Sequence, residues 1–101
     1  MSKPLFPLGR IFATPGALDL GVDFYPYLRR HQCGDWGELG DDDKAENNLS
    51  LKNGLRILSA YHTPDSVKFW IISEADRSST TILLPNDYWP HWPDRRPAPA
   101  R

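Results

Sequence analysis

Two runs of apolar and β-branched residues, separated by a mostly polar stretch, dominate the second half of the chain. They cover residues 67–73 and 80–84. Upstream, residues 55–62 alternate with a period of two, and residues 63–66 (Thr-Pro-Asp-Ser) have the composition of a turn. Such runs, bounded by turn residues, are typical of strands joined by short connections. The pattern therefore predicts a three-stranded antiparallel β-meander.

The first half of the chain predicts short helices. Thr14-Pro15 has the sequence of an N-cap followed by proline at the first helical position, and Gly21 limits this helix to about one turn. A second helix is predicted after Asp23, because apolar residues there recur at the spacing of one helix face. The residues on that face are Phe24, Tyr27, Leu28 and His31.

A third helix is predicted from the acidic run 41–43, with Asp41 or Asp42 as its cap, because carboxylates are favourable at a helix N-terminus. It is expected to end at Gly54, which supplies the left-handed residue after a helix. Its inward residues are expected to be Ala45, Leu49 and Leu51. Residues 1–10 are expected to run extended, and residues 10–13 are compatible with a short edge strand.

The predicted fold class is α+β, with two or three short N-terminal helices packed on the meander and the edge strand as an optional addition. At 101 residues the chain has the length of one domain, predicted over residues 1–88. Residues 89–101, rich in proline, tryptophan and arginine, are predicted to be an extended or disordered tail. The middle strand is apolar on both faces, so the second face needs the N-terminal segment or a partner to cover it.

Composition narrows the function classes. The chain is 40% hydrophobic and 25% charged, which is typical of a soluble domain, and its net charge of −1 argues against a general nucleic-acid binder. A single cysteine, Cys33, excludes an internal disulfide and suits a reducing compartment. No apolar run approaches the ~20 residues that span a bilayer, and the N-terminus lacks the apolar core of a signal peptide. A cytoplasmic protein without membrane association is expected.

Four segments carry a resemblance: residues 13–18 (Ala-Thr-Pro-Gly-Ala-Leu), residues 30–39 around Cys-Gly-Asp-Trp-Gly-Glu-Leu, residues 58–61, and residues 70–85. They resemble a family of small bacterial proteins of about this length, usually labelled hypothetical or plasmid-related and often found on mobile elements. The resemblance covers roughly residues 5–88 and implies a bacterial cytoplasmic accessory protein. It implies no activity, cofactor or catalytic residue.

The polar stretch between the last two strands is the first candidate site. Arg77 offers a planar fork for a phosphate or carboxylate, which Glu74 and Asp76 could hold in position, and Ser78 and Ser79 offer hydroxyl donors. The alternative is an ordinary turn in which Asp76 accepts backbone N–H groups and Arg77 pairs with a neighbouring carboxylate.

A second candidate comprises His31, Cys33, Asp35 and Trp36. A histidine and a cysteine two residues apart could form half of a zinc site or a Cys–His nucleophile pair. The alternative is a helix C-terminus with a small buried cysteine and a packed tryptophan. The acidic run 41–43 is interpreted as a solvated helix start, because it lacks the alternating ligands of a calcium loop.

Trp89 and Trp92 in the tail are the third candidate, as a proline-rich ligand for another protein. The function predicted from these features is a non-enzymatic binding or adaptor protein, plausibly a homodimer, with no cofactor, metal or catalytic residue. Two alternatives remain open. One is a small hydrolase or phosphate-handling enzyme centred on Glu74, Asp76 and Arg77, with His31 or His62 as a further candidate. The other is a nucleic-acid-associated regulator that reads phosphates through Arg29, Arg30, Arg77, Arg95 and Arg96.

Overall fold

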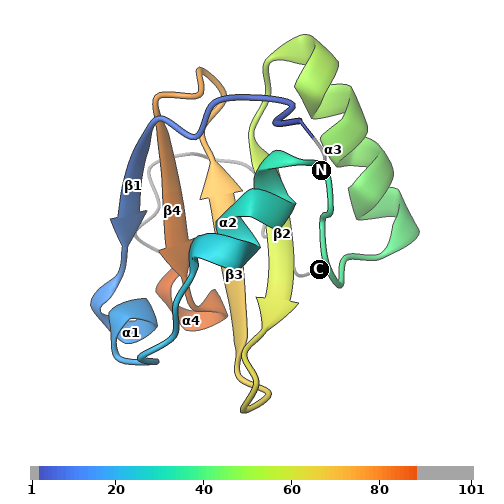
Figure 1. The fold of residues 1–101 in the computed structure, drawn as a ribbon. Coiled ribbons are helices and arrows are strands. Elements are labelled where there is room, and N and C mark those ends of the chain that lie inside the picture. Colours follow the sequence, from blue (N-terminus) through green and yellow to red (C-terminus); the bar gives the residue numbers. More distant parts are fainter. Residues whose placement is uncertain (1–2, 89–101) are drawn as a thin grey trace.

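The computed structural model of the chain describes residues 3–88 as one four-stranded sheet with helices (Figure 1). In chain order the elements are β1 (Arg10–Ala13), α1 (Pro15–Leu18), α2 (Tyr25–Gln32), α3 (Asp41–Asn53), β2 (Ile57–His62), β3 (Lys68–Ser73), β4 (Ser79–Leu83) and α4 (Pro85–Tyr88). The α+β class and the meander β2-β3-β4 are confirmed. The sheet itself is larger than the predicted meander, because β1 joins it.

The strand order in the sheet is β1-β4-β3-β2. The pairs β2–β3 and β3–β4 are antiparallel, whereas β1 runs parallel to β4, with Ile11 opposite Thr80 and Phe12 opposite Thr81. The sheet is therefore mixed, with β1 on one edge and β2 on the other (Figure 1). The predicted edge strand forms over the residues expected, and it completes the sheet.

The first face of the sheet is covered by α1 and α2. Tyr61, Phe69, Ile71 and Ile82 form a buried cluster there with Ala17 of α1, and Phe24, Tyr27 and Leu28 from the second helix segment pack against it. The rings of Tyr27 and Phe69 meet edge to face, 4.9 Å apart between centroids. The inward residues predicted for this helix therefore do face the core, and α2 crosses the front of the sheet in Figure 1.

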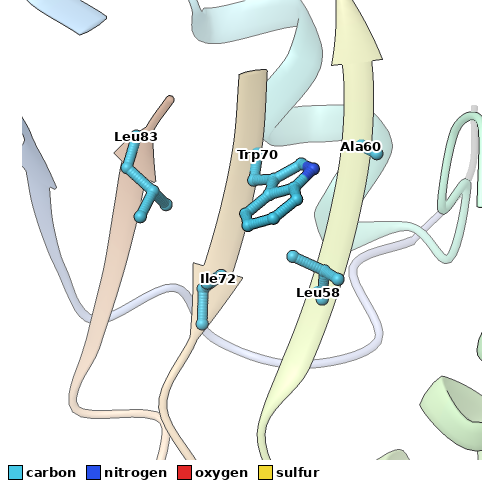
Figure 2. Close-up of a cluster of buried hydrophobic side chains, with 5 residues drawn as sticks. All are labelled: Leu58, Ala60, Trp70, Ile72 and Leu83. Atoms are coloured by element: carbon cyan, nitrogen blue, oxygen red, sulfur yellow. The ribbon is translucent and has the colours of Figure 1, made fainter. Parts of the chain in front are cut away.

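The second face, called the far face below, carries the side chains that alternate with those of the first. It consists of Leu58, Ala60, Trp70, Ile72 and Leu83, which Figure 2 shows on the side of the strands away from α2. The exposed fractions of these side chains are between 0% and 4%. Both faces of β3 are thus buried, as its sequence predicts.

The third helix lies beside β2 at the edge of the sheet (Figure 1) and buries polar rather than apolar residues. The prediction that Ala45 and Leu49 face inward is wrong: both are exposed, and the buried residues are Asn47 and Ser50. The Asn47 amide donates to the carbonyl of Leu58 and accepts from its N–H group. An apolar side chain at position 47 would leave these two backbone groups without that partner, which explains the polar choice.

The ends of α3 agree only in part with the prediction. Gly54 adopts the left-handed conformation after the helix, with a φ of 66°, as expected. The N-cap is Gly40, however, and it makes no side-chain capping bond, so neither Asp41 nor Asp42 caps the helix. Gly40 takes the extended backbone conformation that a cap needs. The acidic residues occupy the first turn, where their negative charges interact favourably with the helix dipole.

The first helix begins as predicted. The Thr14 hydroxyl accepts the N–H group of Ala17 at 3.2 Å and donates to the Asp87 carboxylate at 2.6 Å. The same carboxylate accepts the N–H group of Leu84. Thr14 therefore joins the end of β1 to the start of α4.

Replacing Thr14 with alanine removes both bonds, and we expect the free energy of unfolding to fall by about 1–2 kcal/mol. Urea denaturation followed by circular dichroism measures this change. The Thr14→Ser variant keeps the hydroxyl and serves as the control. Equal stability of the alanine and serine variants would show that the hydroxyl contributes nothing.

Candidate functional site

The connection between β3 and β4 is an ordered turn. The Glu74 N–H group donates to the carbonyl of Ser79, and the Arg77 N–H group donates to the carbonyl of Glu74. The Asp76 carboxylate accepts the N–H group of Ser78 at 3.0 Å. Hydrogen bonding to the Ser78 side chain, together with this backbone bond, lowers the pKa of Asp76. Arg77 has a φ of 60°, in the left-handed region that a side chain disfavours. Something must therefore hold Arg77 in this conformation.

The guanidinium of Arg77 supplies that restraint by binding backbone carbonyls. It donates to Leu55 O at 2.7 Å, Glu74 O at 2.9 Å, Ser50 O at 3.0 Å and Ala75 O at 3.1 Å. Ser50 belongs to the last turn of α3, where its carbonyl also accepts the N–H groups of Gly54 and Leu55, and Leu55 follows that helix. The arginine therefore fastens the turn to the C-terminal end of α3. Its donors point to the protein rather than to a ligand.

The neighbouring side chains have separate partners. Glu74 forms an ion pair with Arg56 at 3.1 Å, and the side chain of Arg56 is only 3% exposed. The guanidinium of Arg77 lies over the ring of Phe6, 5.4 Å from its centroid. Its pKa is lowered by burial. Glu74 and Arg77 therefore hold parts of the fold together, and neither of the two surface hollows described below is lined by this turn.

The second candidate cluster is split by the structure into different environments. His31 is fully buried and Trp36 is 4% exposed, whereas Cys33 is half-buried at the end of α2 and Asp35 is exposed. Trp36 donates its indole N–H to the Asn48 side chain at 3.2 Å. Within residues 3–88, no group of three or more histidine, cysteine or acidic side chains is placed to hold a metal ion.

His31 is the centre of a buried chain of hydroxyl groups. Its Nδ1 lies 2.6 Å from Ser59 Oγ, and its Nε2 lies 2.9 Å from Ser73 Oγ. Ser73 Oγ lies 2.7 Å from Thr80 Oγ1, which donates to the carbonyl of Leu8 at 2.8 Å. Both ring nitrogens are occupied, so His31 is not available to a metal or to a cysteine thiol.

The end of this chain fixes the direction of every proton in it. Thr80 uses its single proton on Leu8, so it accepts from Ser73. Ser73 has then used its own proton and must accept from His31 Nε2. His31 therefore carries its proton on Nε2, and Nδ1 accepts from Ser59. A single neutral tautomer satisfies all the hydroxyls, and burial lowers the pKa of His31 to about 3, with a further contribution from the positive charge of Arg77.

Asp35 belongs to a surface network on the other side of α2. Its carboxylate binds the Nε of Arg30 at 2.7 Å and accepts the N–H group of Gly37. The ion pair with Arg30 lowers the pKa of Asp35. The Arg30 guanidinium stacks over the Tyr61 ring, 4.6 Å from its centroid, and Tyr61 donates its hydroxyl proton to Asp35 O. Asp35 thus closes the turn that follows α2.

Two of the open hollows on the surface have walls among the described residues. One, of about 600 Å³, lies between residues 20–27, Arg30 and the β2–β3 turn at Pro64 and Asp65. The other, of about 560 Å³, has a described wall made by α3 alone, from Asp42, Asp43, Ala45, Glu46 and Leu49. Among the described residues, neither lining contains a serine, cysteine or histidine.

The two edges of the sheet differ in whether their outer backbone groups are hydrogen-bonded to other parts of the chain. At the β2 edge, Glu38 donates to Ala60 O and Ala60 donates to Trp36 O, while Asn47 binds Leu58. The outer side of β2 is therefore bonded to other parts of the chain along its middle. This edge is closed.

At the opposite edge, β1 is the outermost strand. Its Ile11 and Phe12 side chains are 45% and 50% exposed, one on each face of the sheet. The N–H groups of Arg10 and Thr14 donate to β4, so by alternation those of Ile11 and Ala13 point outward. Residues 10–13 were predicted as a strand at the edge of the sheet, but the open outer side of this strand was not predicted. The signal for it in the sequence is the pair of adjacent apolar residues, Ile11 and Phe12, in a short edge strand.

Trp89 and Trp92 lie outside the described residues. No helix within residues 3–88 is long and apolar enough to cross a membrane. Comparison of the chain with protein-family models, with curated proteins and with solved structures found no match. The resemblance to plasmid-related bacterial proteins therefore stays a prediction.

Proposed function

We propose that this chain is a non-enzymatic binding protein whose docking surface is the open edge of β1, and that its first partner is a second copy of the same chain. The observation that carries the proposal is the contrast between the two sheet edges. One is closed by Asn47 and residues 36–38, whereas the other presents Ile11 and Phe12 half exposed. An edge strand with exposed apolar residues is a template for pairing with another strand.

The outward groups of β1 determine the register of such a pair. Ile11 and Ala13 direct their backbone N–H and C=O groups outward, and two residues that exchange both bonds form a hydrogen-bonded antiparallel pair. If Ile11 pairs with the partner's Ala13, the two-fold axis passes through Phe12. Each Phe12 then lies opposite its own copy in the closer, non-hydrogen-bonded position. The sheet would continue through both chains around an isologous interface.

This register also avoids a charge conflict. Arg10 is the one charged residue of β1, and with the axis at Phe12 it faces the partner's Thr14 rather than a second arginine. A register centred on Ile11 or on Ala13 would pair only that residue within the strand, because the other would face Gly9 or Pro15 beyond the ends of β1. Backbone pairing supplies the contact, and the two Phe12 rings supply the apolar area that makes it selective.

The test is the mass of the chain in solution, measured by sedimentation equilibrium over a range of concentrations. We expect the full chain to form a dimer and the Phe12→Lys variant to dissociate at least about tenfold more readily, because like charges directly opposite destabilise a strand pair. Tyr25→Lys adds the same charge at a 66% exposed position on α2 and should leave the dimer intact.

Two results would contradict the proposal. A full chain that stays monomeric at every concentration would remove the second copy as partner. A dimer that survives the lysine at position 12 but not the one at position 25 would move the interface away from β1.

A further inference from the structure

The far face of the sheet is a second surface, separate from the β1 edge, and its burial requires a cover. Its five side chains, Leu58, Ala60, Trp70, Ile72 and Leu83, are as buried as those beneath α2 (Figure 2). The first face owes its burial to α1 and α2. Among the described residues, the partly buried apolar residue that packs against the far-face cluster is Leu39, at its margin. One leucine cannot cover a surface that spans three strands.

The chain has one long segment left to cover this surface. Thirteen residues, 89–101, follow directly after α4, which itself follows β4, and Leu83 of β4 belongs to the far face. Four of the ten prolines lie in this segment, and a polyproline conformation advances about 3.1 Å per residue, or roughly 40 Å in all. Crossing from β4 to β2 requires only about 10 Å, two strand spacings.

The order of residues in the segment matches the order of surfaces across the sheet. Trp89 and Trp92 come first, and Arg95 and Arg96 follow. A path from β4 meets the apolar far face first, with Trp70 at its centre, and then α3 beyond β2. The flank of α3 that walls the hollow of about 560 Å³ is acidic, with carboxylates from Asp42, Asp43 and Glu46.

We propose that residues 89–101 form the cover of the far face within the same chain. The two tryptophans pack on the cluster around Trp70, and the two arginines lie along the acidic flank of α3. Proline restricts the free segment, so less conformational entropy is lost when it docks. With the far face covered in this way, the β1 edge remains as the surface for a partner, and the two proposals concern different surfaces.

The experiment compares the full chain with Trp89→Ala/Trp92→Ala by urea denaturation and by binding of a dye that fluoresces on apolar surface. Burial of large aromatic side chains is worth enough that the double variant should raise the unfolding equilibrium constant at least about tenfold. Dye binding should rise in the folded state. His91→Ala alters the same segment without removing either indole and should leave the urea midpoint within error.

A charge exchange provides a second test in case the tryptophan variant fails to fold. Arg95→Glu/Arg96→Glu should lower the urea midpoint. Adding Glu46→Lys should restore part of the loss, because the new lysine on α3 attracts the new glutamates of the segment. Dimerisation through β1 raises the midpoint of every form of the chain with concentration, but the loss of midpoint relative to the parent should be independent of protein concentration, since the contact lies within one chain.

Three outcomes would overturn the cover. The double tryptophan variant could match the full chain in midpoint and dye binding. The charge exchange could show no coupling between the segment and α3. Finally, the midpoint loss could depend on protein concentration, which would show that a second copy covers the far face. Dimerisation through β1 is measured separately by mass, so failure of either proposal is distinguishable from failure of the other.

Discussion

Replacing His31 with alanine is expected to lower the free energy of unfolding by about 3–5 kcal/mol, a large part of the 5–15 kcal/mol typical of a domain. The substitution leaves a cavity between α2 and the sheet. It also deprives the hydroxyls of Ser59 and Ser73 of their ring partners. A buried polar group without its hydrogen bond costs about 1–3 kcal/mol.

Urea denaturation at pH 7.5 measures this loss. His62→Ala is the matched control, because the His62 side chain is 40% exposed and its contact with the Glu38 carboxylate lies at the surface. We expect this control to cost less than about 1 kcal/mol. A His31 variant as stable as the His62 variant would contradict the role given to the buried hydroxyl chain.

The same histidine gives the protein a characteristic pH dependence. Its pKa is about 3 in the folded chain and close to 6.5 when unfolded, so the unfolded state binds the proton first as the pH falls. The contribution of neutral His31 is complete above pH 6.5 and is lost below it, by about 1.4 kcal/mol per pH unit. Between pH 7.5 and 5 the free energy of unfolding should therefore fall by about 2 kcal/mol from this group.

The His31→Gln variant isolates that contribution, since it retains His62 and all the carboxylates. Between pH 7.5 and 5, the unfolding free energy of this variant should fall by about 2 kcal/mol less than that of the parent. The lowered pKa values of Asp35 and Asp76 act in the same direction but at lower pH, where carboxylates titrate. Parallel curves for the variant and the parent would show that His31 binds its proton as readily in the folded state as in the unfolded state.

Replacing Arg77 with alanine is the second large effect. The guanidinium donates to the carbonyls of Ser50 and Leu55 as well as to those of Glu74 and Ala75, and it thereby fastens the β3–β4 turn to the end of α3. Hydrogen bonds to charged groups contribute more than neutral ones, although this side chain is partly exposed. We expect a loss of about 2–4 kcal/mol in the free energy of unfolding.

Two further variants separate the causes. Arg77→Gly loses the same bonds but relieves the positive φ of 60°, so it should be more stable than Arg77→Ala by about 1 kcal/mol. Arg77→Lys keeps the charge without the fork and should fall between alanine and the parent. Arg29→Ala, whose partner is Gln32 one helical turn away, is the control for losing an arginine. A loss at position 77 no larger than at position 29 would contradict the bridging role.

Most of the secondary structure could be predicted from local patterns in the sequence. The period-two alternation of residues 55–62, the Thr14-Pro15 helix start and Gly54 after α3 each depend on neighbours a few residues away. The parallel pairing of β1 with β4 depends instead on about seventy residues of intervening chain, so alternation alone could not assign it. The meander was therefore predicted and the mixed sheet was not.

The turn between β3 and β4 could be predicted from the sequence, but the partners of its side chains could not, because they are distant in the chain. Arg77 has the residue type expected of an anion-binding turn, and only the position of α3 shows that its donors go to backbone carbonyls. Asn47 illustrates the same limit, because a polar residue inside a helix suggests solvent until the β2 backbone is placed beside it. Long-range partners, rather than propensities, decided both residues.

Mixing two charge variants of one residue tests pairing through β1 without relying on the loss of a dimer. Phe12→Lys and Phe12→Glu, each monomeric alone, should form a heterodimer when combined, because the proposed two-fold axis places position 12 opposite itself. Native mass spectrometry of the mixture would detect it. We expect a species containing one copy of each variant, which salt weakens. A mixture in which both variants remain monomeric, while the parent chain dimerises, would contradict pairing through β1.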